Sequence, residues 1–125
     1  MSEMEISENY GFSAAREAGG LLFCSGQIGL EADGAVPADS SRQFELAFAA
    51  VQAVLARHGC GADDIVDLTS FHVGYPDHME AFMAAKDAFM SGADSCWTAI
   101  GVAALGYPGS LVEIKAIARL PVDAA

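Results

Sequence analysis

Leu111-Val112-Glu113-Ile114-Lys115-Ala116-Ile117-Ala118-Arg119 has the pattern of a strand with apolar residues on both faces. Successive side chains of an extended chain point to opposite faces. Leu111 and Ile117 therefore add apolar surface to the face that carries the charged residues. The other face carries only apolar residues, which are Val112, Ile114, Ala116 and Ala118. Because this pattern favours burial on both faces, we expect the strand to lie inside a sheet that is covered on both sides.

Two further strands precede this one. Ile65 to Val73 contains the β-branched and aromatic residues typical of strands, and Gly74 to Pro76 breaks it. Trp97 to Val102 predicts another strand, which the turn at Gly106 to Gly109 separates from the last one.

A helix is predicted between these two strands. Asp77 and Glu80 form a pair similar to a capping box at its start, and Gly92 ends it. Its residues at helical spacing form one stripe, made of Met79, Phe82, Met83, Lys86 and Phe89.

The first part of the chain predicts a hairpin. Phe12 to Glu17 and Leu21 to Ile28 flank Gly19-Gly20, and two extended runs about a glycine pair are typical of a tight β-turn. Leu30 to Ala38 contains Asp-Gly and proline, so we expect a loop there.

A second helix is predicted to follow this loop. Ser40 and Gln43 have the spacing of a capping box, and Gly59 is a suitable C-terminal stop. Between them, apolar residues recur at helical spacing at Phe44, Phe48, Val51 and Leu55.

The predicted order is ββαβαββ, an α+β fold in one domain that spans residues 1–125. Two helices of this length cover one face of such a sheet. Copies of the chain offer the simplest cover for the second apolar face, so we expect a homo-oligomer.

Composition and charge limit the classes of function. The net charge of −11 comes from 17 acidic and 6 basic residues, and the basic residues are scattered. This charge opposes nucleic-acid binding. No apolar run suits a membrane span, and the acidic N-terminus is unlike a secretory signal, so we expect a cytoplasmic protein. Cys24, Cys60 and Cys96 lack the spacing of a disulfide framework or a metal site.

Three segments, in this order, resemble one known family. They are GLLFCSGQIG at 20–29, DIVDLTSF at 64–71, and WTAIGV at 97–102 together with VEIKAIA at 112–118. They are similar to the SGQ strand, an internal strand and the C-terminal hairpin of the Rid/YjgF family of reactive intermediate deaminases. The resemblance covers about Phe12 to Arg119.

The resemblance implies a chorismate-mutase-like fold, with a mixed sheet and two helices on one face, and a homotrimer with a small-molecule cleft at each subunit interface. It implies hydrolysis of an imine or enamine, such as 2-iminopropanoate, to a ketoacid and ammonia. It implies no metal and no organic cofactor.

The family's functional residues match this sequence only in part. Glu113 falls on the position of a glutamate that positions a water, and Ser25 and Gly26 fall on the strand that lines the cleft. Trp97 occupies the position of the arginine that binds the substrate carboxylate, and Phe12 that of a tyrosine. Met83 and Lys86 stand where deaminating members often have asparagine and tyrosine. Subgroups without the arginine are not expected to deaminate 2-imino acids.

Two residues have two interpretations each. Trp97 is either an aromatic wall of the cleft or a large core or interface residue. Glu113 is either a general base with a raised pKa or a partner in a salt bridge with Lys115, Arg119 or a neighbouring subunit. A pairing of Cys96 with His72 as nucleophile and base is the weaker idea, because nothing in the sequence brings them together.

Two functions follow as hypotheses. One is an enzyme that hydrolyses a more apolar or aromatic imine, enamine or related carbon–nitrogen bond, with Glu113 activating water and backbone N–H groups near Ser25 and Ala99 stabilising negative charge. The other is a trimeric module that only binds or senses a small metabolite. Ribonuclease activity, which is attached to parts of this family, is disfavoured by the net charge.

Overall fold

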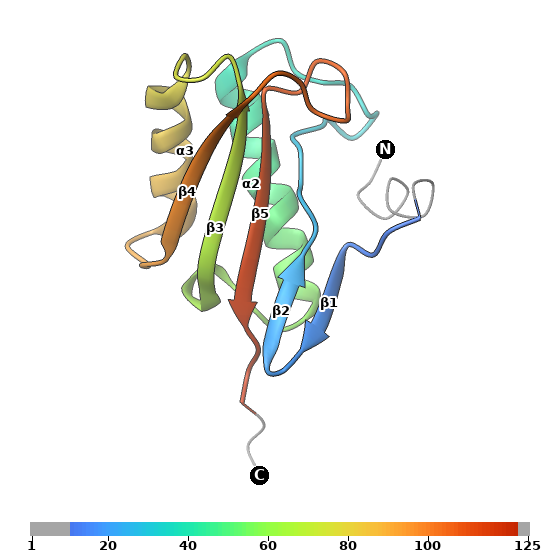
Figure 1. Ribbon diagram of the computed structural model, residues 1–125, viewed down its shortest axis with the longest axis vertical. Coiled ribbons are helices and arrows are strands. Elements are labelled where there is room, and N and C mark those ends of the chain that lie inside the picture. The colour runs from blue at the N-terminus through green and yellow to red at the C-terminus, as the bar shows by residue number, and fades with distance from the viewer. Residues whose placement is uncertain (1–10, 123–125) are drawn as a thin grey trace.

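The computed structural model describes residues 11–122. They form a five-stranded sheet and two long helices, and Figure 1 shows both helices behind the sheet. The elements are β1 (Ala15–Ala18), β2 (Leu21–Cys24), α2 (Ser40–Arg57), the short 3-10 helix η1 (Ala62–Asp64), β3 (Ile65–Val73), α3 (Met79–Met90), β4 (Cys96–Val102) and β5 (Val112–Arg119). The predicted order and α+β class are confirmed. Neither helix is long and apolar enough to cross a membrane within these residues.

The sheet is mixed, with the strand order β1-β2-β5-β3-β4. β5 lies at its centre and pairs antiparallel with both β2 and β3, while β3 and β4 run parallel. The expectation that the last two strands form a C-terminal hairpin is therefore wrong, because β3 lies between them. A parallel pair needs a crossover rather than a tight turn, and α3 provides that crossover between β3 and β4 (Figure 1).

The N-terminal hairpin is confirmed, with shorter strands than the sequence predicted. Ala18 pairs with Leu21, so Gly19 and Gly20 form a two-residue turn. Both glycines have positive φ, 59° and 79°, which only glycine adopts without strain and which matches the twist of a hairpin.

The strand register separates the two faces of the sheet. Ala116 of β5 aligns with Leu68 of β3, and Leu68 aligns with Trp97 of β4. This row faces the helices, and its members Ala116 and Leu68 are buried in the core with Phe44 and Phe48 of α2 and Phe82 of α3.

The other face, here called the open face, has no helix over it in the described part of the chain (Figure 1). Phe23 and Ile100 lie on it and are 41% and 39% exposed. Burial of both faces was the prediction, and this chain by itself covers one.

The helix caps differ from the predicted ones. Asp39, not Ser40, caps α2, and its carboxylate accepts a hydrogen bond from the Ser41 amide at 3.2 Å. Asp39 is an equally good capping residue one position earlier, and the helix itself begins at Ser40 as predicted. α3 begins after His78, which makes no side-chain capping bond, so the predicted pair Asp77 and Glu80 is not a capping box. Gly59 follows α2 with a φ of 74°, as expected of a C-terminal stop.

Gln43 joins the start of α2 to the centre of the sheet instead of capping the helix. Its side chain is buried, its Oε1 accepts a hydrogen bond from the Leu111 amide, and its Nε2 donates to the Pro37 carbonyl at 3.4 Å. The loop beside it contacts α2 closely, because a Cβ at Gly29 would collide with the Gln43 carbonyl. Only glycine fits at position 29.

Substitution of Gly29 by alanine should destabilise the fold by about 1–3 kcal/mol, the usual range for overpacking a tight contact. Urea unfolding followed by circular dichroism measures this loss. Gly61→Ala is the matched control, because a Cβ there meets no atom within 4 Å and the backbone has a φ of −139°. Equal stability of the two variants would contradict the close contact at Gly29.

Candidate functional site

Five of the six predicted site residues divide into two groups on different surfaces of the chain. Glu113 aligns with Phe71 and so lies on the open face. Gly26 lies against Glu113, and Ser25 is its neighbour in the chain. Trp97 aligns with Leu68, and Ala99 with Ser70, so both lie on the helix-covered face. One chain therefore does not bring Glu113 and Trp97 together.

Glu113 lies directly across Gly26. A Cβ at position 26 would lie 2.5 Å from Oε2 of Glu113 and 2.6 Å from its Cγ. The absence of a side chain at Gly26 thus makes the space that the glutamate fills. Within this chain the group that lies closest to Gly26 is the side-chain carboxyl of Glu113.

Burial raises the pKa of the Glu113 carboxyl above its ordinary value. Within residues 11–122 no cation pairs with this carboxylate, so neither Lys115 nor Arg119 forms the intrachain salt bridge considered above. A half-buried carboxylate without a cation holds a proton more readily than an exposed one. This is the property that a general base near neutral pH needs.

The segment before β1 runs beside Ser25. The Ser25 amide donates to the Ala14 carbonyl at 2.8 Å, and its hydroxyl donates to the Ser13 carbonyl at 2.6 Å. The hydroxyl is thereby used in a local hydrogen bond that holds this segment against Ser25. Phe12 precedes this segment and is 42% exposed.

Trp97 is anchored at the edge of the helix-covered face. Its indole Nε1 donates a hydrogen bond to Oγ of Ser70 at 2.9 Å, and its ring stacks against Phe82 with 6.1 Å between centroids. The Nζ of Lys86 lies over the same ring, 4.5 Å from its centroid. Trp97 packs against the hydrophobic core but is only partly buried. It is therefore in part a core residue, and its remaining surface is free to line a cleft.

Ser70 and His72 were not predicted as partners of Trp97. Ser70 is fully buried, and its Oγ also lies 2.8 Å from Nε2 of His72. Burial lowers the pKa of His72, which keeps the imidazole neutral. The sequence places Ser70 and His72 on the same face of the strand as Leu68, because these residues occupy alternate positions.

The considered pair of Cys96 and His72 does not form. Cys96 aligns with Asp67 on the open face, while His72 aligns with Gly101 on the covered face. The described residues contain no group of three histidine, cysteine or acidic side chains that would hold a metal ion.

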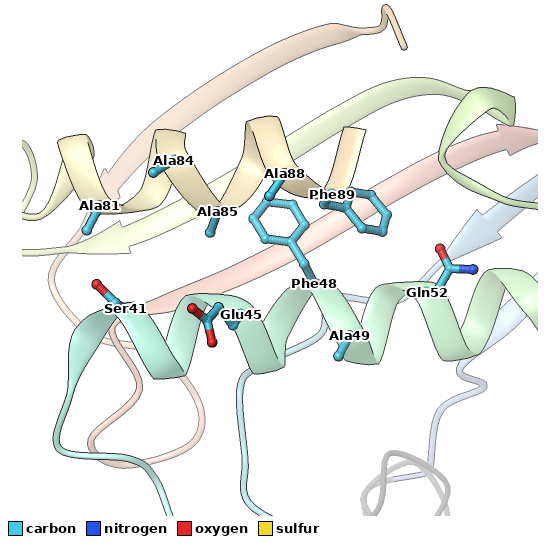
Figure 2. A pocket seen from close by; sticks show the side chains of 10 residues that line it. All are labelled: Ser41, Glu45, Phe48, Ala49, Gln52, Ala81, Ala84, Ala85, Ala88 and Phe89. Carbon is cyan, nitrogen blue, oxygen red and sulfur yellow. The ribbon is translucent and has the colours of Figure 1, made fainter. Parts of the chain in front are cut away.

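A groove of about 500 Å³ runs between α2 and α3 on the outer side of the helical layer (Figure 2). Phe48 and Phe89 form its centre, and half of its ten lining residues are alanines, four of them on α3 and one on α2. None of the six predicted site residues lines it. It is therefore separate from the candidate site.

Comparison with known proteins agrees with this fold. A family model described as endoribonuclease L-PSP matches residues 3–120. The RutC family protein YjgH of Escherichia coli K12 is 44% identical over 111 residues, which is 88% of this chain and 83% of that protein. A solved structure of protein YJGH has a TM-score of 0.86 and 41% identity, and the match covers 94% of this chain and 90% of that one.

A more distant structure has the same fold. A putative endoribonuclease L-PSP from Entamoeba histolytica is 26% identical with a TM-score of 0.81, and the match covers 87% of each chain. The match of the family model over nearly the whole sequence, together with the YjgH relative, shows that this chain belongs to the endoribonuclease L-PSP family, which is the YjgF/Rid family.

Proposed function

We propose that this protein is a homotrimeric hydrolase that deaminates a small imine or enamine in clefts between its subunits. The observation that carries this proposal is the carboxyl of Glu113, which is half-buried, has no cation partner among residues 11–122 and lies against a glycine on an open sheet face. Membership of the YjgF/Rid family supports a small-molecule-binding or deaminase-like role.

Glu113 activates the attacking water in this proposal. Its carboxylate takes a proton from water while the water oxygen bonds to the carbon of the C=N group, and then gives that proton to the nitrogen. In the resulting carbinolamine the carboxylate takes the hydroxyl proton and gives it to the amino nitrogen. The C–N bond breaks, ammonia leaves, and a carbonyl compound remains. Backbone N–H groups near Ser25 and Ala99 stabilise the negative charge that develops.

The separation of the site residues favours clefts built by two subunits. Glu113 and Gly26 lie on the open face, whereas Trp97 lies at the other face of the sheet. Phe23 and Ile100 leave apolar surface on the open face, and a second chain that covers it buries this surface. Each cleft then contains Glu113 from one subunit and Trp97 from a neighbouring subunit.

Trp97 shifts the substrate range towards apolar and aromatic compounds. An arginine at position 97 would bind a carboxylate through two parallel hydrogen bonds, and an indole ring offers an apolar face instead. We therefore expect imines with long or aromatic side chains to react better than 2-iminopropanoate.

Glu113→Gln should lower kcat for hydrolysis of an aromatic imine by about 100-fold or more, since general base catalysis contributes about 10²–10⁴-fold. The imines are generated from a panel of amino acids by an oxidase, and their disappearance is timed by semicarbazide trapping. Glu45→Gln, which changes an exposed carboxylate on α2, is the matched control and should keep full activity. Unchanged turnover in Glu113→Gln excludes the glutamate as the base.

The rate should also depend on pH through Glu113. The carboxyl acts as a base only when ionised, and burial raises its pKa. Hydrolysis should therefore increase as pH rises through a value above that of an ordinary glutamate. A profile of kcat/KM against pH measures this limb. If Glu113→Gln retains some activity but loses the limb, the limb belongs to Glu113; a limb that persists belongs to another group.

A second candidate function is ligand binding without catalysis. Trp97 supports it, because the position of the substrate-binding arginine carries no charge. In that case wild-type protein hydrolyses no imine of the panel, and Glu113→Gln changes neither turnover nor affinity.

Trp97→Arg distinguishes the two functions further. Hydrolysis of 2-iminopropanoate should appear or rise in this variant if the remaining machinery is intact. The matched control is Trp97→Phe, which keeps an aromatic ring without adding charge. Circular dichroism must first show that both variants fold, because Trp97 also bonds to Ser70. A folded Trp97→Arg variant without hydrolysis would favour the binding module.

A further inference from the structure

Lys86 places a positive charge beside the ring of Trp97. Its Nζ lies 4.5 Å from the ring centroid, on the side of α3 that faces the sheet. Among residues 11–122 no carboxylate pairs with this ammonium and no hydrogen bond is made to it. In a chain with 17 acidic and 6 basic residues, a cation that meets an aromatic ring instead of a carboxylate is notable.

The position of the Lys86 ammonium depends on the Trp97 ring, which two neighbouring residues hold in place. Ser70 holds the indole through a hydrogen bond of 2.9 Å, and Phe82 stacks against the same ring. Phe82 and Lys86 are separated by one helical turn, so the residues that position the ring and the cation share one face of α3. A cation over the face of a tryptophan is attracted by the negative charge of the ring, which restricts the flexible lysine stem.

The Lys86 ammonium has the apolar ring of Trp97 on one side and is partly exposed to solvent. Met83, one turn earlier, is 45% exposed, and neither Trp97 nor Lys86 is fully buried. Met83 is three residues before Lys86 on α3, which makes the two side chains neighbours on the helix surface, and Lys86 in turn lies over Trp97. Such a surface suits an organic anion whose carboxylate meets the ammonium and whose apolar part lies against the methionine and the indole edge.

We propose that Lys86 binds the carboxylate of an apolar or aromatic organic acid at this surface, so that the charge missing at position 97 is supplied from α3. This inference rests on the proposed function, and it narrows the substrate class to imines or enamines that carry a carboxylate as well as an apolar group. Lysine makes a single-point contact where arginine makes a two-pronged one, so the anion is held less rigidly.

Phenylacetate and phenylacetamide are suitable probes, because they share a ring and differ in charge. Trp97 is the only tryptophan of the chain, so quenching of tryptophan fluorescence reports on this surface alone. Phenylacetate should bind the wild-type protein about 10-fold more tightly than phenylacetamide, as expected for a hydrogen bond to a charged group. Added salt should weaken phenylacetate binding only.

Lys86→Met keeps the length of the stem and removes the charge. It should lower the affinity for phenylacetate about 10-fold and leave that for phenylacetamide unchanged. Lys86→Arg should keep the preference for the acid. Arg42→Met is the control for net charge, because Arg42 is exposed and pairs with Glu31 at the start of α2, and it should bind both probes as the wild type does.

Equal affinity of the wild-type protein for the two probes would overturn this inference, as would no binding of either probe or a preference for phenylacetate that survives in Lys86→Met. These results concern binding and do not depend on turnover. Wild-type protein that binds phenylacetate through Lys86 but hydrolyses no imine would overturn the proposed deaminase and support the assignment of Lys86.

Discussion

The structure depends on a sheet whose central strand is buried by helices on one side only. β5 pairs with β2 and β3, and its residues Val112, Ile114, Ala116 and Ala118 are essentially inaccessible to solvent beneath the helical layer. Burial of this apolar face is the main stabilising term, and the alternation of the strand then directs Glu113 to the opposite face. The same strand thus builds the core and presents the carboxyl.

The two sides of the sheet therefore have different roles. On the covered side, buried polar groups satisfy one another, as Ser70 does for Trp97 and for His72. On the open side, Glu113 lacks a cation within the described residues and shares the face with the exposed Phe23 and Ile100. A carboxyl in such a place is costly for folding, and a site that uses it gives a reason for the cost.

The sequence predicted element types well because periodicity and turn residues report on local structure. Gly19-Gly20, the stripe of α2 and the alternation of β5 each gave a correct element. Pairing between distant strands left no local signal, so the parallel contact of β3 with β4 was missed and a hairpin was expected. α2 begins at Ser40 as predicted, but its cap was misassigned, because Asp39 and Ser40 are equally good capping residues.

The candidate site was predictable to a similar degree. Alternation sets the faces within one strand, but only the register of β3 against its two neighbours shows that Glu113 and Trp97 lie on opposite faces. The contact of Glu113 with Gly26 and that of Lys86 with Trp97 join residues far apart in the chain. No local pattern encodes such contacts, and they are the ones on which the proposed chemistry depends.

Because Glu113 lies against Gly26, a substitution at either of these two positions affects which residues the other can accept. Any side chain at position 26 would displace the carboxyl, so the glycine keeps the glutamate in its present place. A lineage that abandoned the carboxyl would be free to fill position 26, whereas one that kept it would not. The residue at position 26 of a relative is thus a record of whether the carboxyl there still occupies the same place.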